Sequence, residues 1–269
     1  LHTYYLYTRF IKIMIRFIRN ILSPDKKRRY YAVKLFGDFV FGDYRQSWSE
    51  LDWLHDANFN SYLELFDERR GFNSHRKIAL WELLRLTRFV DGDTAECGVF
   101  EAASSYLICA ANAASPEMER QHHLFDSFEG LSKPNAADGD HWKEGALAAG
   151  VELVKENLAP FQDQLIFHKG WIPTQFGNAS NRTFSFVHVD VDLEQPTRDS
   201  IEFFYERMTP GGIFLCDDYA FVTCPGATNA IDEFLANKTE KMLRLPGGGG
   251  FFIKGTKTGA PALIHTGEE

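Results

Sequence analysis

The sequence predicts an α/β protein with a mostly parallel sheet and a C-terminal antiparallel hairpin, preceded by N-terminal helices. From about residue 94, short apolar runs alternate with stretches of helical spacing. Runs buried on both faces, with helical crossovers between them, are typical of parallel strands. The segment "KMLRLPGGGGFFIKG" then places two short strands around a glycine turn, which predicts a hairpin. Polar residues gather where the apolar runs end, and open α/β sheets bind their ligands at that edge.

The N-terminal region follows a different pattern. Residues 4–22 place apolar side chains at helical spacing, with four Lys or Arg residues between them. This pattern predicts a basic amphipathic helix. Further helical patterns run through about 47–56, 58–70 and 75–89. We therefore expect a helical extension over residues 1–74 and a second domain over residues 75–269.

The strands of the second domain are predicted in five runs. In chain order these are "TAECGV", "HHLFDS", "QLIFHKG", "FSFVHVD" and "GIFLCDD". Helical patterns cover about 103–114, 145–158, 196–208 and 226–237. Five β-α units followed by a hairpin form the layout of the class I methyltransferase sheet, which is Rossmann-like. The glycines at 247–250 are followed by no Lys-Ser/Thr pair and no helix, which argues against a P-loop.

Composition narrows the class of protein. The 269 residues are 44% hydrophobic and 25% charged, which suits one large globular domain with a small helical appendage. The four cysteines form no CxxC pair, so we expect buried thiols in a reducing, cytoplasmic compartment. No apolar stretch approaches the roughly 20 residues that a membrane span needs. The net charge of −8 argues against nucleic acid as a partner.

Charge is divided unevenly along the chain. Residues 1–34 hold nine Lys or Arg and one acid, a local charge of +8, and subtracting +8 from the total of −8 leaves −16 for the remainder. Three interpretations fit this basic apolar segment: a helix on an anionic membrane surface, a helix packed on its own acidic chain, or an oligomer contact. We favour packing against protein and expect a homo-oligomer, with membrane-surface contact as the alternative.

Two strand ends carry residues suited to a nucleotide-like ligand. The first ends in "AECGVFEAASS", where Gly98 permits close backbone approach and a helix start near Ala103 offers free N–H groups beside Ser104. Such a helix start suits a carboxylate or phosphate. The second ends in "LFDSFEG", where Asp126 has two oxygens that could accept both hydroxyls of a ribose. A tight turn at Gly98 and a cap at Asp126 are the structural alternatives.

Acidic residues end two further strands. Side chains alternate along a strand, so Asp190 and Asp192 leave its end on one side, whereas Glu194 belongs to the following loop or helix start. The next strand ends in Asp217 and Asp218, and neighbouring parallel strands would bring both ends to one rim. Clustered carboxylates repel unless a cation sits among them, and oxygen ligands alone favour Mg²⁺. Solvated or helix-capping acids are the alternative.

Five segments, in matching order over about residues 75–255, resemble the macrocin O-methyltransferase (TylF-type) family of sugar-modifying enzymes. They are "AECGVFEAASS", "DSFEGL", "KGWIPTQF", "HVDVDLEQPT" and "PGGIFLCDDYAFVTCPGATNAIDEFL". The resemblance implies an S-adenosylmethionine- and Mg²⁺-dependent O-methyltransferase domain over 75–269, acting on a hydroxyl of a sugar or glycosylated small molecule. By this resemblance, the metal ligands are Asp190, Asp217 and Asp218. The residues at the methionine end of the cofactor are Glu96, Gly98 and Ser104, and the ribose acceptor is Asp126.

Further site residues follow from the same pattern. Ser127, beside the ribose acceptor, and Trp171, which could flank the adenine or simply pack, complete the expected cofactor-binding residues. Asp190 or Asp192 would take the proton from the attacking hydroxyl, because Leu193 stands where some relatives have a histidine base.

The sequence departs from the family at other positions too. Ala102 and Ala103 replace the usual glycines, and Glu194 stands where the family often has Tyr. His141 and Trp142, in a polar loop, are expected in a lid. Two other functions were weighed. A dehydrogenase on the same sheet needs a Tyr/Lys or His set near the cofactor, which the sequence does not offer convincingly. A non-catalytic binding domain that kept the fold is the other alternative.

Overall fold

The computed structural model describes residues 2–25, 28–29, 31–33, 35–36, 56–68 and 73–259. The chain divides into two compact units, Leu1–Asn60 and Ser61–Glu269. The helical pattern expected at 47–56 lies outside the described residues, apart from Asp56. The domain boundary expected at residue 74 stays a prediction.

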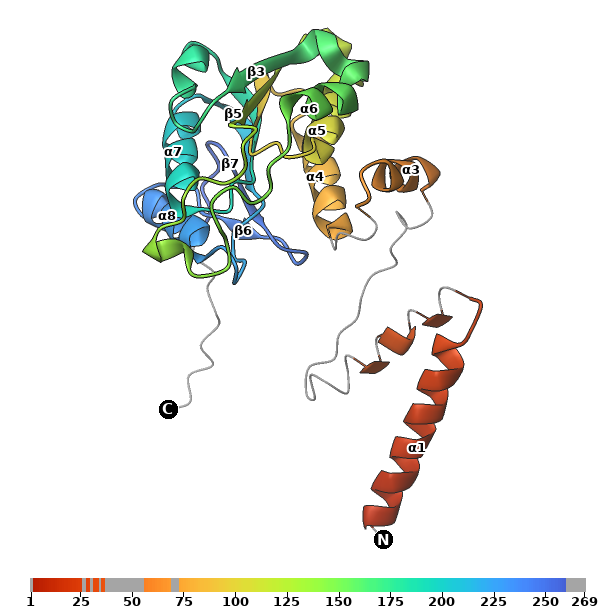
Figure 1. Cartoon of the computed structure of the whole chain (residues 1–269). Helices are drawn as coiled ribbons and strands as arrows, with labels where there is room; N and C mark the ends of the chain where they lie inside the picture. The colour runs from red at the N-terminus through yellow and green to blue at the C-terminus, as the bar shows by residue number, and fades with distance from the viewer. Residues whose placement is uncertain are drawn as a thin grey trace. The chain divides into compact units, whose positions relative to one another are not determined.

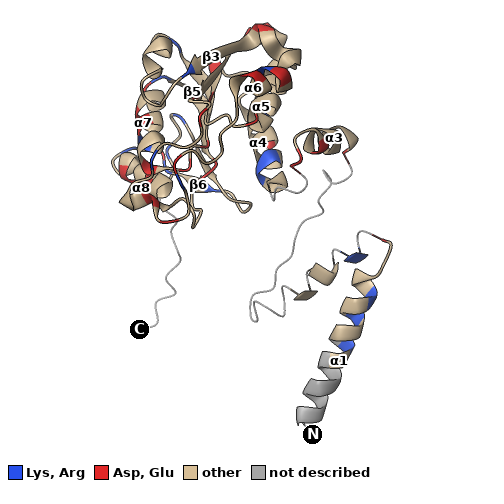
Figure 2. Cartoon of the chain, viewed as in Figure 1, with Lys and Arg blue, Asp and Glu red and all other residues tan. Residues whose placement is uncertain are grey.

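The first unit contains the predicted basic amphipathic helix. α1 (His2–Ile21) carries Lys and Arg but no acidic residue (Figure 2). Ile15, Ile18 and Ile21 are exposed on this helix, so its apolar stripe faces solvent in the isolated chain. Among the described helices, none is both long and apolar enough to cross a membrane.

The second unit is built on a seven-stranded sheet in the order β3-β2-β1-β4-β5-β7-β6 (Figure 1). The strands are β1 (Asp93–Cys97), β2 (His122–Asp126), β3 (Leu165–Lys169), β4 (Phe184–Val189), β5 (Met208–Cys216), β6 (Leu243–Arg244) and β7 (Gly250–Ile253). β1 to β5 pair in parallel, whereas β7 is antiparallel to both β5 and β6. The predicted fold class, a mostly parallel sheet with an antiparallel C-terminal hairpin, is confirmed.

Helices cover both faces of this sheet. α4, α5 and α6 lie on one face, and α7 and α8 lie on the other (Figure 1). The α-helices are α3 (Ala57–Leu65), α4 (Ser74–Leu86), α5 (Ala103–Ala113), α6 (Val151–Asn157), α7 (Glu194–Tyr205) and α8 (Pro225–Leu235). Short 3-10 helices are η2 (Pro116–Met118), η3 (Ala136–Asp138), η4 (Ala159–Gln164) and η5 (Phe176–Ala179).

One helix prediction is wrong in its first half. A helix was expected over 145–158, but α6 begins only at Val151. Gly145 and Leu147 adopt positive φ angles of 76° and 59°. A right-handed helix requires negative φ, so the backbone cannot be helical at these residues. The segment before α6 is instead a loop at the ligand-binding edge of the sheet.

The core explains why the strands read as continuous apolar runs. On the α7 side, Phe184, Phe204 and Phe214 are fully buried, and on the α5 side Leu124 and Val154 are buried as well. A central strand therefore buries both of its alternating faces, which removes the polar positions of a half-exposed strand. All four cysteines are buried free thiols, as expected.

Strand register sets the position of the functional edge. Cys97 of β1 lies opposite Val189 of β4, and Val189 lies opposite Cys216 of β5. The residues that follow these three positions therefore leave the sheet at the same level. Parallel pairing thus brings together the loops that carry the predicted glycine and the predicted acids.

Candidate active site

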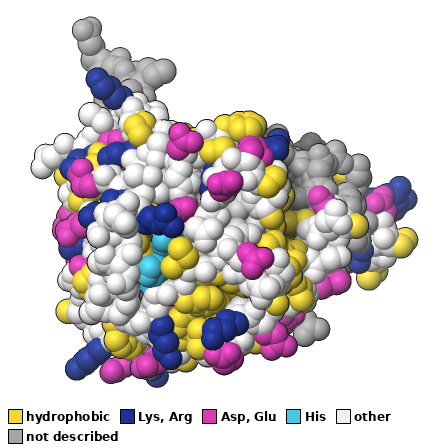
Figure 3. Space-filling model, turned by 90° about the horizontal axis from the view of Figure 1, so that it is seen from above, with side chains coloured by type: hydrophobic (Ala, Val, Ile, Leu, Met, Phe, Trp, Pro, Cys, Tyr) yellow, Lys and Arg dark blue, Asp and Glu magenta, His cyan; other side chains and the backbone are white. Residues whose placement is uncertain are grey.

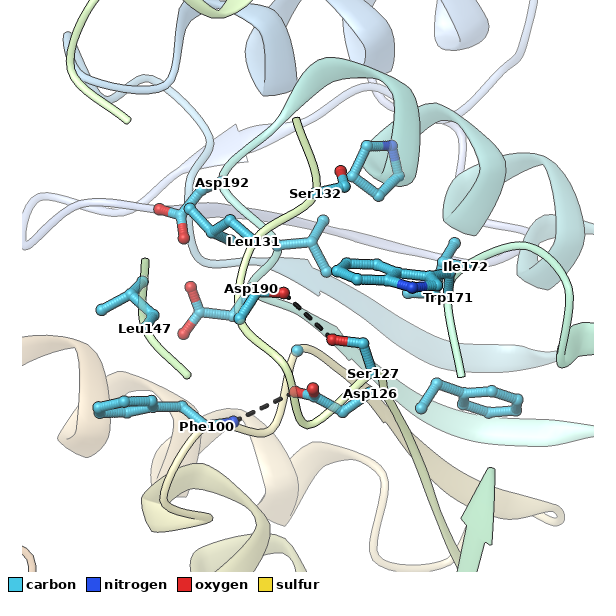
Figure 4. A pocket seen from close by; sticks show the side chains of 15 residues that line it. Phe100, Asp126, Ser127, Leu131, Ser132, Leu147, Trp171, Ile172, Asp190 and Asp192 are labelled. Carbon is cyan, nitrogen blue, oxygen red and sulfur yellow. Dashed lines mark hydrogen bonds between the residues drawn. The ribbon is translucent and has the colours of Figure 1, made fainter. Parts of the chain in front are cut away.

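Two adjoining hollows open at the carboxyl ends of the strands. The smaller, of ≈ 90 Å³, is drawn in Figure 4, and the larger measures ≈ 360 Å³. Both are lined by Gly98, Phe100, Leu147, Asp190 and Asp192, so they meet along a common wall. The larger hollow falls within the ~300–1,000 Å³ typical of ligand sites.

The loop after β1 is held by close backbone packing. Gly98 has a φ of +80°, and a Cβ there would lie 1.9 Å from the carbonyl oxygen of Asp190. The close backbone approach that we expected at this glycine is therefore made by the main chain just after β4. Phe100 and Ala102 also have positive φ, of 48° and 70°. Such a conformation costs a non-glycine residue about 1–2 kcal/mol, a cost that glycine would avoid at the position of Ala102.

Asp126 ties two strand ends together. One carboxylate oxygen accepts hydrogen bonds from the N–H groups of Val99 (2.6 Å) and Phe100 (3.3 Å), as Figure 4 shows for Phe100. The other oxygen accepts from the N–H of Phe128 (2.6 Å). Ser127 and Trp171 line the smaller hollow together with Asp126. The three residues predicted for the adenosine half of the cofactor therefore share one wall.

The smaller hollow is open to solvent on one side. Trp171 and Leu147, which line it, are 42% and 43% exposed, so a ligand there would contact both side chains. The mixed lining, with a carboxylate, two serine hydroxyls and an indole ring, fits a nucleoside chemically.

Glu96 is engaged inside the protein. It is 1% exposed, and its carboxylate lies 2.7 Å from Nδ1 of His188, which is equally buried. The second carboxylate oxygen accepts a hydrogen bond from the Ser105 hydroxyl. Burial acts to lower the pKa of His188, but the neighbouring carboxylates of Asp217 and Glu96 outweigh it and raise this pKa to about 10. Glu96 lines the larger hollow yet forms a buried ion pair there.

Ser104 lies beside a lysine that sequence reasoning missed. Its hydroxyl accepts a hydrogen bond from Nζ of Lys77 (2.6 Å), and this ammonium lies 3.6 Å from Glu68. Ser104 and Lys77 both line the larger hollow at the first turn of α5. A lysine and a helix N-terminus suit a carboxylate, so the methionine end of the cofactor fits here. Lys77 gave no usable signal, because a lysine on an amphipathic helix most often faces solvent.

The four predicted acids converge, but they separate into two groups. Ligand atoms of His188, Asp190 and Asp217 lie within 4.8 Å of one another, and those of Asp192, Asp218 and Cys224 do the same. The predicted trio of Asp190, Asp217 and Asp218 is therefore split between the groups. The carboxylate of Asp218 accepts hydrogen bonds from the backbone N–H groups of Val191 (3.1 Å) and Asp192 (2.7 Å).

The pKa values of these four acids are shifted in different directions. Burial and neighbouring carboxylates raise the pKa of Asp190 to about 7 and that of Asp218 well above its usual range. Burial also raises the pKa of Asp192 to about 6. For Asp217 burial acts in the same direction, but the positive charges of His188 and Arg76 outweigh it and lower the pKa. Three of the four acids thus lack a sufficient cation, and their oxygen ligands fit a hard divalent ion.

A long loop closes the larger hollow. His141 and Trp142 line it, and the indole N–H of Trp142 donates to Sγ of Cys224 (3.4 Å). The loop is anchored through buried Asp138, which accepts hydrogen bonds from the backbone N–H of Glu194 (2.6 Å) and of Asn135 (2.7 Å). The two residues expected in a lid therefore lie over the acids, on a segment fixed to the start of α7.

Comparison with known proteins agrees with this geometry. The family model described as macrocin-O-methyltransferase (TylF) matches residues 83–251, which is more than half of the chain. The 8-demethyl-8-(2,3-dimethoxy-alpha-L-rhamnosyl)-tetracenomycin-C 4'-O-methyltransferase of Streptomyces olivaceus is 31% identical over 150 residues, which cover 52% of this chain and 58% of that protein. The demethyldecarbamoylnovobiocin O-methyltransferase of Streptomyces niveus is 27% identical over 228 residues, 76% of this chain and 83% of that protein.

Solved structures share the fold. The O-methyltransferase NovP is similar with a TM-score of 0.59 and 23% identity, over 67% of this chain and 80% of that one. A calicheamicin methyltransferase is similar with a TM-score of 0.61 and 17% identity, over 87% of this chain and 95% of that one. With the family match spanning β1 to β7, the chain belongs to the macrocin O-methyltransferase (TylF) family.

Proposed function

We propose that this protein transfers the methyl group of S-adenosylmethionine to a hydroxyl of a sugar carried by a small molecule, with the help of a divalent ion. The observation that carries the proposal is the meeting of two hollows at one wall. Asp126, Ser127 and Trp171 line one of them, and the acid cluster lines the other. A cofactor bound across both would bring its reactive centre close to Asp190 and Asp192.

The chain's own residues divide the work of this reaction. Asp190, Asp217 and Asp218 would hold the ion, which when bound would lower the pKa of a hydroxyl that it coordinates. Either Asp190 or Asp192 accepts the proton as the hydroxyl attacks. Asp192 suits this role because it has a φ of 59°, and strained backbone at a site is compatible with a functional position. Lys77 and Ser104 orient the cofactor from the opposite end.

The wall over the acids has the composition of an acceptor site. Trp142 and Phe221 offer apolar rings, and His141 and Thr223 offer polar groups, around the larger hollow. Such a mixture suits a sugar, which presents both C–H and O–H groups. One relative acts by name on a rhamnosyl tetracenomycin, and another is named mycinamicin III 3''-O-methyltransferase, of Micromonospora griseorubida. We therefore propose a glycosylated small molecule as the acceptor.

Labelled S-adenosylmethionine tests the proposal directly. The protein is incubated with a panel of glycosylated small molecules, with Mg²⁺ or with EDTA, and products are identified by mass spectrometry. We expect transfer to a sugar hydroxyl that EDTA abolishes. Asp192→Asn should lower kcat by about 100-fold or more, whereas Asp163→Asn, which removes an exposed charge elsewhere, should leave it unchanged. Calorimetric binding of NAD instead of S-adenosylmethionine would contradict the proposal.

The N-terminal unit has a separate proposed role. We propose that α1 packs its exposed apolar stripe against protein, in a homo-oligomer. Exposed Ile15, Ile18 and Ile21 support this, since an apolar stripe of this kind marks an interaction surface. Deletion of residues 1–34 should lower the sedimenting mass. Salt-sensitive flotation of a monomer with anionic liposomes would favour membrane-surface contact instead.

The face shown in Figure 3 mixes acidic and basic side chains among its described residues.

A further inference from the structure

Arg76 brings a permanent positive charge to the predicted metal ligands, beside the buried His188. The guanidinium of Arg76, near the start of α4, forms an ion pair with the carboxylate of Asp217 at the end of β5. The arginine side chain is 19% exposed and that of Asp217 is 7% exposed, so the pair is largely shielded from water. The ion pair joins residues 141 positions apart in the chain, and Arg76 lines the larger hollow.

The position of this guanidinium is fixed from three sides. A second nitrogen of Arg76 donates to the side-chain oxygen of Asn73 (2.5 Å). The guanidinium carbon also lies 5.1 Å from the centre of the Phe221 ring, within the range of a cation–π contact. Arg76 is therefore preorganised, and Asp217 is the acid that it neutralises directly.

Arg76 and a divalent ion would share one carboxylate. Asp217 lies beside Asp190 within metal-ligand distance, so it is available to an ion that enters the acid cluster. Arg76 holds Oδ2 of Asp217, and Oδ1 lies 3.9 Å from Nε2 of His188. An ion that coordinates this carboxylate brings a further positive charge next to the guanidinium and weakens its ion pair. Arg76 and the ion therefore oppose each other at Asp217.

We propose that Arg76 is a built-in counter-ion of Asp217 and competes with the divalent ion for this carboxylate. The inference rests on the proposed function, which places an ion in the acid cluster. In the metal-free protein Arg76 offsets part of the repulsion among the acids. When the ion binds, the guanidinium withdraws toward Asn73 and Phe221, which hold it in the wall of the larger hollow. Metal affinity is therefore lower than the four acids alone would give.

Calorimetric titration of the full chain with Mn²⁺ alone, without cofactor or acceptor, tests this competition. Arg76→Gln should bind Mn²⁺ about tenfold more tightly than the wild type, which corresponds to about 1.4 kcal/mol. Arg76→Lys, which keeps the charge but loses the fork of donors, should show a smaller gain in the same direction. The matched control is Arg85→Gln, on the same helix, where the arginine is 70% exposed and paired with Glu82. Its affinity should stay within about twofold of the wild type.

A double-mutant cycle separates competition from simple repulsion between cations. If Arg76 acts through Asp217, the gain in Mn²⁺ affinity that Arg76→Gln gives disappears in the Asp217→Asn background. Loss of all Mn²⁺ binding in Asp217→Asn would also agree with this. An equal gain in both backgrounds would mean that Arg76 repels the ion through space, and would overturn the proposal. So would unchanged or weaker binding by folded Arg76→Gln and Arg76→Lys.

The failure of this inference can be told from failure of the proposed function. If the wild type binds Mn²⁺ but both Arg76 variants bind it equally, only the competition is wrong. If the wild type binds no Mn²⁺ and still transfers methyl groups, the metal itself is wrong, and the inference falls with it. Thermal unfolding without metal gives an independent reading, because Arg76→Gln should lower the unfolding temperature and Arg85→Gln should not.

Discussion

Replacement of Glu96 by alanine should destabilise the protein before it affects the cofactor. The Glu96 carboxylate and the His188 ring are both 1% exposed and lie 2.7 Å apart. Alanine would leave His188 with Asp217 at 3.9 Å and would remove the acceptor of the Ser105 hydroxyl. Removing one partner of a buried ion pair typically costs about 3–5 kcal/mol.

The pKa of His188 gives a second, independent scale for this cost. Its rise from 6.5 to about 10 corresponds to on the order of 5 kcal/mol, shared between Glu96 and Asp217. About 3 kcal/mol for Glu96 alone agrees with both figures. Because the folded-state pKa is raised, this stabilisation is complete below pH 6.5 and is lost as the pH rises through 10. The deficit of the variant should therefore shrink between pH 7 and pH 10.

Urea unfolding followed by circular dichroism measures the change, and calorimetry with S-adenosylmethionine measures cofactor affinity. Glu82→Ala is the matched control, because that carboxylate is 54% exposed and pairs with Arg85 on the surface. It should stay within about 0.5 kcal/mol of the wild type. If Glu96→Ala unfolds like the wild type but loses cofactor affinity, Glu96 contacts the cofactor and the buried pair is not its main role.

Three further predictions address the cofactor, the loop and a buried histidine. Asp126→Ala should weaken S-adenosylmethionine binding by about 1–3 kcal/mol in calorimetry, and unchanged affinity would move the ribose contact elsewhere. Asp138→Ala should lower the free energy of unfolding in urea by about 2 kcal/mol, since it removes the carboxylate that accepts the Glu194 N–H at the start of α7. It should also raise the KM for the acceptor. An unchanged KM, or an equal rise in the control Asp140→Ala at an exposed residue, would contradict this. Burial lowers the pKa of His168 to about 4, so its stabilisation is present above pH 6.5 and is lost as pH falls toward 4. Unfolding curves of wild type and His168→Gln should therefore converge by about 3 kcal/mol over that range, and parallel pH profiles would refute the assignment.

The sequence alone determined the layout of the sheet. Strands buried on both faces are mostly apolar, and amphipathic crossovers repeat at helical spacing, so both leave local patterns that can be read without a structure. The acids at the ends of β4 and β5 were found for the same reason, because they interrupt apolar runs at Asp190 and Asp217. Family resemblance then supplied the cofactor and the reaction.

The spacing of apolar residues mispredicted one stretch of helix, because the backbone there has a non-helical conformation. The stretch over 145–158 has helical spacing, yet positive φ at Gly145 and Leu147 delays the helix to Val151. The loop before α6 instead exchanges backbone hydrogen bonds with the loop after β2, where Leu131 pairs with Gly145 and Ala146. Spacing records which residues are apolar, and it does not record such contacts.

Only the tertiary structure decided how the charges at the site are paired. Asp217 meets Arg76 across 141 positions of the chain, and Glu96 meets His188 across 92. Neither partner differs, in the sequence, from a solvated arginine on a helix or a core histidine in a strand. An ion pair depends on distance and burial, and both arise only when β1, β4, β5 and α4 pack together. The sequence could therefore place the acids at one rim, whereas the packing of these elements decides which of the acids has a cation beside it.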